Sequence, residues 1–307
     1  MTPPVVLSIA ATDSGGGAGL TADLATFAAL GVHGACVVTA LTAQDTTAVH
    51  AVHTVPTEVV AAQLDAVLGD LPVAAVKAGV LASVETVRLV AERCAHLPIV
   101  VDPVLRATTG AVLADAEVTA AYRELLLPVA ALITPNAAEA RVLLGRDGPP
   151  ERLAAELADH GPAVIVTGGA PAGVDGADVI HGADVIRGAD VIDEVDCVDW
   201  LAVPGHAPQP LRHPVVPTAN DHGTGCTFSA AVTAHLPADL PHTGPPTYSA
   251  EPLATRARRA PEALGWIAVR AARFTTAQLA RSSTWELGRG RGPIAHITAD
   301  TTTGEHR

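Results

Sequence analysis

The chain has 307 residues, of which 49% are hydrophobic, 17% are charged and only 3% are aromatic. This composition excludes a disordered chain and a small disulfide-stapled domain, and it predicts a large core filled with small aliphatic side chains. The 19 basic and 32 acidic side chains give a net charge of −13, which argues against a broad basic surface for nucleic acid or an anionic membrane.

The first residues predict no targeting segment, because they carry no basic stretch and reach the polar Thr12 and Asp13 too soon for a signal peptide. The most apolar stretch, residues 27–43, is interrupted by glycine, histidine and threonine and falls short of the ~20 apolar residues of a membrane-spanning helix. Four cysteines lie far apart with no C-x-x-C pair, so the sequence suggests neither a zinc site nor a disulfide framework. We expect a protein of the reducing cytoplasm with no membrane partner.

Short runs rich in valine and isoleucine predict strands that are buried on both faces. In chain order these runs are Val5–Ala10, Ala35–Leu41, Ala74–Ala78, Pro98–Val101, Ala131–Thr134 and Ala163–Thr167. Segments with helical spacing lie between most of them, and Gly31 and Gly69 stand where helix ends are expected. The alternation predicts an α/β fold with a doubly wound, mostly parallel sheet, helices on both faces and ligands at the carboxyl ends of the strands.

Two segments interrupt this alternation. Residues 176–193 repeat the unit GADVI three times, which we interpret as an expanded edge hairpin or flap. Residues 237–261 are rich in proline and polar side chains, as expected of a surface insertion. We expect residues 1–307 to form one domain that carries both insertions.

The segment Asn220–Cys226 leads directly into an alanine-rich stretch with the composition of a helix. Glycines before a helix leave N–H groups pointing at one spot, where the helix dipole also favours an anion such as phosphate. Cys226 would lie in the first helical turn, where the dipole lowers the pKa of a thiol. The alternative interpretation is a tight turn and a buried cysteine, and we expect Cys36 and Cys94 to be core residues of that kind.

The opening stretch from Ser8 to Thr46, SIAATDSGGGAGLTADLATFAALGVHGACVVTALTAQDT, resembles the hydroxymethylpyrimidine/phosphomethylpyrimidine kinases of thiamine synthesis, which have a ribokinase-like fold. Further motifs of that family follow in order. They are Asp102-Pro-Val104, Leu132-Ile-Thr-Pro-Asn136 with Glu139, Gly168-Gly169, His222-Gly-Thr-Gly-Cys-Thr227, and G-x-G-x-G-P-x-x-H from Gly288 to His296. The resemblance covers nearly the whole chain apart from the two insertions.

The resemblance implies a cytoplasmic, homodimeric enzyme that uses ATP to phosphorylate the hydroxymethyl group of a pyrimidine or its monophosphate, or a related small alcohol. Such chemistry is mostly positioning and charge stabilisation. Gly223, Thr224 and Gly225 would supply backbone donors to the transferring phosphoryl group. Cys226 occupies the place where ribokinase relatives carry an aspartate base.

The resemblance also implies a nucleotide and metal side formed by Asp102, Asn136, Glu139, Thr167 and Gly168. Asp102 and Glu139 would hold Mg²⁺ through water, because Mg²⁺ dehydrates reluctantly. Without a metal, the same residues are common as a turn after a strand (Asp102) and as a helix N-cap (Asn136).

On the substrate side, the resemblance implies that Asp23 and Gln44 bind the pyrimidine ring while Ala18 and Val80 line its walls. The alternative is an exposed first-turn acid at Asp23 and an ordinary loop polar residue at Gln44. The glycine-rich loop 288–292 is expected to close over the edge of the pocket rather than to contact nucleotide.

The chain departs from the family pattern at two lysines, which are replaced by Thr108 and Thr167. Losing one donor to the developing charge typically costs ~10²–10³ in rate. Arg106, or Arg187 or His181 of the repeat, would then supply charge. Two functions follow: a kinase of a hydroxymethylpyrimidine or related alcohol, or a weakly catalytic or non-catalytic relative that binds a pyrimidine or nucleotide as a sensor or partner.

Overall fold

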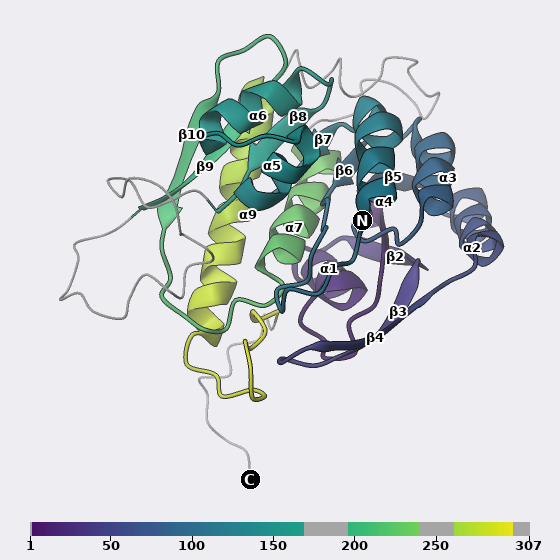
Figure 1. Cartoon of the computed structure of the whole chain (residues 1–307), viewed down its shortest axis with the longest axis horizontal. Helices are drawn as coiled ribbons and strands as arrows, with labels where there is room; N and C mark the ends of the chain where they lie inside the picture. Colours follow the sequence, from purple (N-terminus) through teal and green to yellow (C-terminus); the bar gives the residue numbers. More distant parts are fainter. Residues whose placement is uncertain (1, 169–195, 240–260, 297–307) are drawn as a thin grey trace.

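We analysed a computed structural model, which describes residues 2–168, 196–239 and 261–296. Their main feature is an eight-stranded sheet with the strand order β10-β9-β8-β7-β6-β5-β1-β2 (Figure 1). The strands of this sheet are β1 (Val5–Ala10), β2 (His33–Val38), β5 (Val73–Ala78), β6 (Ile99–Val101), β7 (Leu132–Ile133), β8 (Ala163–Val166), β9 (Asp196–Ala202) and β10 (Gln209–Pro214).

The order of the strands places a ligand crevice beside β1 and β5. From β1 the chain moves outward to β2 at one edge, and it then returns to the other side of β1 and adds β5, β6, β7 and β8 in parallel. Such a reversal leaves the connections at the carboxyl ends of β1 and β5 diverging, and ligands bind in the resulting crevice. The expected doubly wound, mostly parallel sheet is confirmed.

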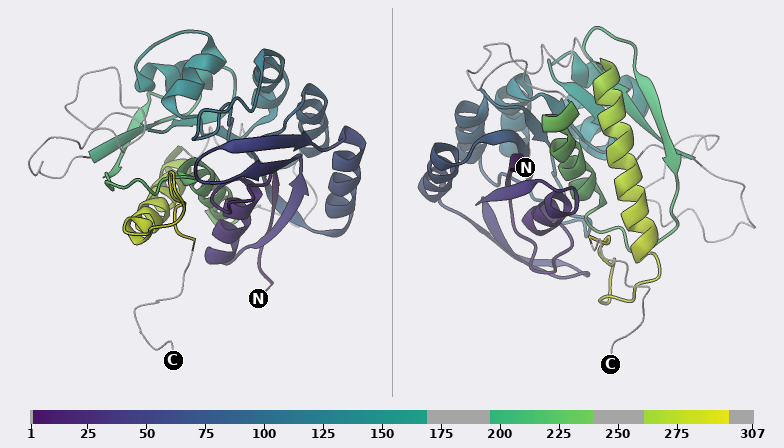
Figure 2. Two further views of the ribbon diagram at one scale, coloured as in Figure 1. Left: turned by 60° about the horizontal axis from the view of Figure 1, so that its bottom comes forward. Right: turned by 180° about the vertical axis from the view of Figure 1, so that it is seen from behind.

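Helices cover both faces of the sheet (Figures 1 and 2). One face carries α2 (Thr57–Asp70), α3 (Val84–Cys94), α4 (Ala116–Ala121), α5 (Ala137–Leu144) and α6 (Pro150–Ala158), with a π-helical turn and a 3₁₀ turn after α4. The other face carries α1 (Gly19–Ala29), α7 (Thr224–Asp239) and α9 (Pro261–Ser282). Successive residues of β1 serve the two layers, since Leu7 and Ile9 pack under the first group and Val6 packs against α1 and α7.

The expected helices form, and their ends follow local capping chemistry. Ser83 and Asp115 cap α3 and α4 by accepting backbone N–H groups. Gly31 follows α1 with a φ of 75°, as predicted for a residue just past a helix end. Gly69 does not end a helix, because α2 continues to Asp70.

The expected strand at residues 35–41 is wrong in its extent, because the chain leaves the main sheet at Thr39. The Thr39 N–H donates to the Ala10 carbonyl, while its hydroxyl donates to the Val80 carbonyl at 2.5 Å. Beyond this point β3 (Ala40–Gln44) pairs with β4 (Val49–Thr54) in a separate antiparallel hairpin. Cys36, expected in the core, is exposed on the edge strand β2, whereas Cys94 is buried as expected.

The GADVI repeat, with His181 and Arg187, lies outside the described residues, as does most of the proline-rich segment. The expected start of that segment is corrected, since α7 continues through Pro237 to Asp239. Within the described ranges, no helix is both long and apolar enough to cross a membrane.

Candidate active site

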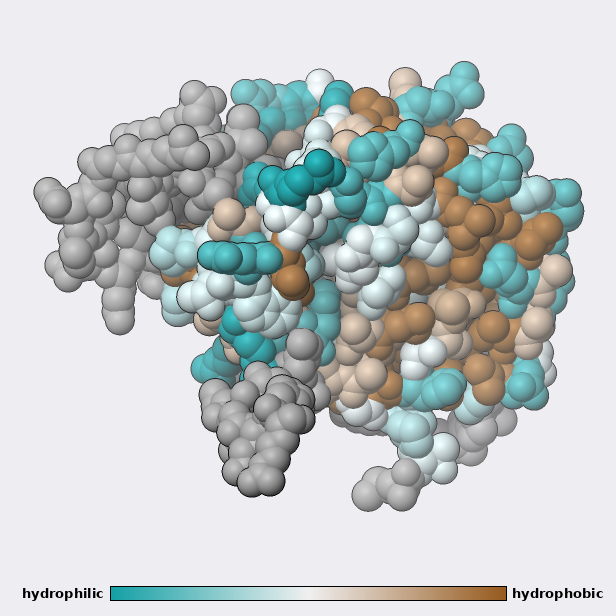
Figure 3. All heavy atoms as spheres, turned by 90° about the horizontal axis from the view of Figure 1, so that it is seen from below, coloured by the Kyte–Doolittle hydropathy of each residue, from teal (hydrophilic) through white to brown (hydrophobic). Residues whose placement is uncertain are grey.

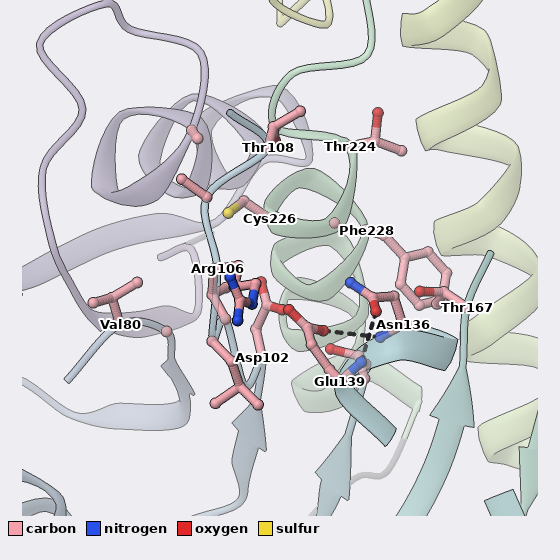
Figure 4. A pocket seen from close by; sticks show the side chains of 18 of the residues that line it. Val80, Asp102, Arg106, Thr108, Asn136, Glu139, Thr167, Thr224, Cys226 and Phe228 are labelled. Carbon is pink, nitrogen blue, oxygen red and sulfur yellow. Dashed lines mark hydrogen bonds between the residues drawn. The ribbon is translucent and has the colours of Figure 1, made fainter. Parts of the chain in front are cut away.

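A cleft of about 1440 Å³ opens at the carboxyl ends of the parallel strands. It collects side chains from distant parts of the chain, which Figure 4 shows around one pocket. All but one of the predicted site residues line it: Ala18, Gln44, Val80, Asp102, Asn136, Glu139, Thr167, Gly168, Gly223, Thr224, Gly225 and Cys226. The exception is Asp23.

The segment Asn220–Cys226, called the anion loop from here on, leads into α7 and includes its first residues. Gly223 has a φ of 88°, and a Cβ at this position would collide with the carbonyl oxygen of Gly17, so only glycine fits. The N–H groups of Gly225 and Cys226 fall in the first turn, where no carbonyl of the helix can accept them. Together with the helix dipole, they make this end of α7 suited to a phosphoryl group.

Cys226 lies at the cleft as predicted, but its thiol is not activated in the predicted way. Burial raises the pKa of Cys226 to about 12, and the carboxylates of Asp102 and Asp23 add to the increase, while the ammonium of Lys77 opposes it. The helix dipole does not overcome these effects. Cys226 is therefore a neutral thiol at physiological pH, and the expected lowering of its pKa is wrong.

Asp23 is not among the residues that line the cleft, and its predicted contact with the pyrimidine ring stays a prediction. Its side chain is fully buried and accepts hydrogen bonds from Lys77 Nζ, at 2.9 and 3.0 Å, and from the Ser8 hydroxyl, at 2.6 Å. Lys77 Nζ also lies 3.4 Å from Asp102 Oδ2, and that oxygen accepts a hydrogen bond from Ser229. Asp23 thus belongs to a buried network beneath the cleft.

Lys77 is the functional candidate that the sequence reasoning missed. It is the only lysine of the chain, and it stands inside an apolar strand that ends at the cleft. Burial alone would lower the pKa of Lys77, but the neighbouring Asp23 and Asp102 raise it above its ordinary value. The ammonium therefore stays charged and anchors Asp102 from below.

Asp102 and Glu139 bring two carboxyl groups to the cleft. Glu139 and Asn136 form a reciprocal N-terminal cap of α5, in which each side chain accepts the backbone N–H of the other at 2.9 Å (Figure 4). The capping role weighed for Asn136 is therefore real. Burial, reinforced by the charge of Asp102, raises the pKa of Glu139 to about 8.

Gln44 lies at the end of β3 and contacts His222, with 3.2 Å between Gln44 Nε2 and His222 Nε2. His222 Nε2 is also 2.8 Å from Asp13 Oδ2. Burial alone would raise the pKa of Asp13, but hydrogen bonds from His222 and the N–H groups of Gly15 and Ala18 lower it below its ordinary value. The Asp13 carboxylate therefore holds in place both the loop of residues 13–18 that follows β1 and the imidazole of His222 beside Gln44.

The glycine-rich loop 288–292 lies at the edge of the site, as expected, and joins two other loops. Arg291 donates its N–H to the Thr46 carbonyl at 3.0 Å, and its guanidinium pairs with Asp221. His222 donates its N–H to the Gly292 carbonyl at 3.0 Å. The loop thus connects the turn that follows Gln44 to the anion loop.

The two threonines that replace family lysines lie in different surroundings. Thr108 Oγ1 is 3.4 Å from His222 Nδ1, whereas Thr167 pairs with Asn136 in an isolated bridge. Arg106 lines the same cleft, is exposed, and forms no ion pair within the described part of the chain. Its guanidinium is therefore available to an anionic ligand.

Comparisons with known proteins identify one family. The sequence profile of the phosphomethylpyrimidine kinase family matches residues 13–244. The chain is 39% identical over 304 residues to the hydroxymethylpyrimidine/phosphomethylpyrimidine kinase of Rhizobium meliloti, covering 95% of this chain and 97% of that protein. It is 37% identical over 296 residues to the enzyme of the same name from Escherichia coli, covering 95% and 97%.

Solved structures give the same fold. A Bacillus subtilis pyridoxal kinase in complex with ADP superposes with a TM-score of 0.72 at 29% identity, covering 96% of this chain and 98% of that chain. A phosphomethylpyrimidine kinase from Clostridium difficile gives a TM-score of 0.64 at 28% identity, with 89% and 98% covered.

Proposed function

The chain belongs to the phosphomethylpyrimidine kinase family, and we propose that it transfers the terminal phosphoryl group of ATP to the hydroxymethyl group of a hydroxymethylpyrimidine or its phosphate. The observation that carries this proposal is the meeting of three features in one cleft. The anion loop at the start of α7 lines the same cleft as two groups of side chains: Gln44, Ala18 and Val80, and Asp102, Glu139 and Thr167. One domain, residues 1–307, would hold the whole site.

In the proposed arrangement the acceptor hydroxyl lies beside Cys226, and the phosphoryl group lies on the N–H groups of Gly225 and Cys226. The Thr224 N–H, expected among these donors, instead donates to the Asp221 carbonyl at 3.2 Å. Because Cys226 is a neutral thiol, it would orient the hydroxyl rather than remove its proton before transfer. A loose phosphoryl-transfer transition state places little demand on an early base, so positioning and charge stabilisation are the main requirements. Arg106 would supply the cation that Thr108 and Thr167 do not.

The donor set on the nucleotide side fits Mg²⁺. Asp102 and Glu139 are hard oxygen ligands, and Glu139 forms no ion pair with any described residue. The repulsion that raises the pKa of Glu139 is what a divalent cation beside the two carboxyl groups would relieve. When bound, the ion would neutralise charge on the ATP phosphates.

A homodimer is also proposed, on the basis of the β3–β4 hairpin. Thr42, Gln44, Val52 and Thr54 line the cleft, and the opposite face of the hairpin exposes Leu41. Seen from below, apolar residues gather on the side of the molecule that carries the hairpin, α2 and α3 (Figure 3). Light scattering should give twice the monomer mass, and Leu41→Lys should shift the protein toward monomer.

The kinase assay uses the purified chain with ATP and Mg²⁺, and hydroxymethylpyrimidine, its monophosphate or pyridoxal as the acceptor, with products identified by mass spectrometry. We expect ADP release that depends on the acceptor, and a phosphorylated pyrimidine as the product. Phosphorylation of pyridoxal alone would overturn the proposed acceptor. ATP hydrolysis that does not depend on any acceptor would overturn the proposed reaction.

A further inference from the structure

At the β9–β10 end of the cleft, three side chains with metal-binding atoms lie on one face of an antiparallel strand pair. Cys197 on β9 is the direct cross-strand partner of His213 on β10. Asp199 follows Cys197 by two residues, so the pleat of the strand places both side chains on the same face. All three line the cleft, on the side of Gly168, whose N–H donates to Asp199.

The distances suit one small cation. A sulfur, a carboxylate oxygen and an imidazole nitrogen from the three residues lie within 4.8 Å of one another. Asp199 Oδ2 and His213 Nε2 are 3.2 Å apart. Zn–N and Zn–O bonds of about 2.0–2.2 Å in a tetrahedron place two such ligand atoms roughly 3.3–3.6 Å apart, so the Asp199–His213 pair is already close to the required spacing.

The outer contacts of these side chains are those that hold metal ligands in place. His213 Nδ1, the nitrogen that faces away from Asp199, lies 3.4 Å from the Pro214 carbonyl oxygen. Asp199 Oδ1 accepts the Gly168 N–H at 3.0 Å, which leaves Oδ2 for a ligand. Ligating histidines and carboxylates are oriented by such second contacts.

We propose that Cys197, Asp199 and His213 bind one Zn²⁺ ion, with a fourth coordination position open to the cleft. A thiolate, an imidazole and a carboxylate together favour zinc over Mg²⁺ or Ca²⁺, which prefer sets of oxygen ligands. The sequence shows no zinc motif because the ligands stand on two strands and include one cysteine only. The site goes beyond the proposed kinase reaction and does not depend on it.

Zinc has to displace an existing interaction. The contact of 3.2 Å between His213 Nε2 and Asp199 Oδ2 occupies the site without metal, so zinc binding has to replace it. The ion can reach the ligands, because 22% of the His213 side chain is exposed and Cys197 is only half-buried.

The test uses the full-length, tag-free protein after treatment with a chelator. Zinc is titrated in competition with a chromophoric chelator, and Co²⁺ is added separately to detect a thiolate-to-cobalt charge-transfer band. We expect one tight site, and we expect the cobalt band to disappear in Cys197→Ser. Loss of a direct ligand in Cys197→Ser or His213→Gln should weaken zinc binding by at least the ~10–100-fold that loss of an outer contact typically costs.

Two matched controls come from the same chain. Cys36→Ser changes an exposed cysteine on β2, and His206→Gln changes an exposed histidine in the turn between β9 and β10. Both should bind zinc as the wild type does, and zinc should raise the unfolding temperature of both. The proposal is overturned if the wild type takes up no stoichiometric zinc, or if Cys197→Ser and His213→Gln fold normally and keep wild-type affinity.

Discussion

The charged groups beneath the cleft and beside Gln44 differ from those that face the proposed nucleotide. Beneath the cleft Lys77 pairs with Asp23 and Asp102, and beside Gln44 Asp13 pairs with His222. At the nucleotide end, Arg106 and Glu139 have no ion-pair partner in the described ranges. We infer that the paired side chains stabilise the fold, whereas Arg106 and Glu139 are available to a ligand.

The largest effect is expected for Lys77→Met. This change leaves Asp23 and Asp102 buried without their cation, and breaking a buried pair in this way typically costs ~3–5 kcal/mol of unfolding free energy. Arg93→Met is the matched control, because Arg93 pairs with Asp65 on the surface, where such pairs contribute roughly 0–1 kcal/mol. Denaturant unfolding measures both. Equal losses for the two variants would mean that the buried Lys77 network contributes no more to stability than a surface ion pair does.

Cys226→Ala should reduce kcat about 100-fold, as a misplaced reacting group can. ATP binding should stay nearly unchanged, because the proposed arrangement puts the thiol beside the acceptor hydroxyl and not beside the nucleotide base. Steady-state kinetics and nucleotide titration separate the two effects, and Cys36→Ala should keep the wild-type rate. A Cys226→Ala enzyme with unchanged kcat would make this cysteine structural.

Asp13→Asn should lower stability by about 1–2 kcal/mol near neutral pH, because the Asp13 carboxylate accepts hydrogen bonds from His222 and backbone N–H groups. The pKa of Asp13 is lowered from its ordinary value of 3.8 on folding. Its contribution is therefore complete above pH 3.8 and is lost as the pH falls through the lower folded pKa. Unfolding measured across this range should show wild type and variant converging in acid. A constant difference would mean that the carboxylate charge has no part in this stability.

Thr167→Lys should raise kcat on the pyrimidine, by up to about tenfold, because a new ammonium at the nucleotide end favours the more highly charged transition state. Thr108→Lys is the comparison, since Thr108 contacts His222 near the acceptor end and a lysine there would crowd that histidine. Steady-state kinetics should show a higher kcat than the wild type for Thr167→Lys and a lower kcat for Thr108→Lys. A loss of activity in Thr167→Lys would show that the existing cations already occupy that space.

Much of the fold could be predicted because the buried strands are continuous apolar runs and the polar residues follow their ends. The end of β2 could not be predicted, because the chain leaves the main sheet at Thr39, inside an apolar run. The hydrogen bonds of Thr39 to the Ala10 and Val80 carbonyls mark this point, and they are visible only in the structure. The β9 and β10 strands were also missed. The side chains of β10 are exposed or half-buried, and two aspartates interrupt the apolar residues of β9, so neither strand has the apolar pattern that marked the parallel strands.

Sequence reasoning predicted the site residues whose conformation depends on a local motif. It missed the features that depend on a residue far away in the chain. The anion loop and the cap of Asn136 are local, and both form. Asp23 has an ordinary sequence context, and its burial against Lys77, 54 residues away, could not be read from it. The thiol of Cys226 was misjudged for a similar reason, because its pKa depends on burial and on carboxylates from other strands.

The most direct test of the division between the two ends is the separation of Michaelis constants in two variants, Gln44→Ala and Arg106→Ala. Steady-state kinetics with hydroxymethylpyrimidine and ATP give both constants for each enzyme. The account predicts that Gln44→Ala raises the KM for the pyrimidine and leaves that for ATP unchanged, while Arg106→Ala raises the KM for ATP and leaves that for the pyrimidine unchanged. An equal rise of both constants in both variants would contradict it.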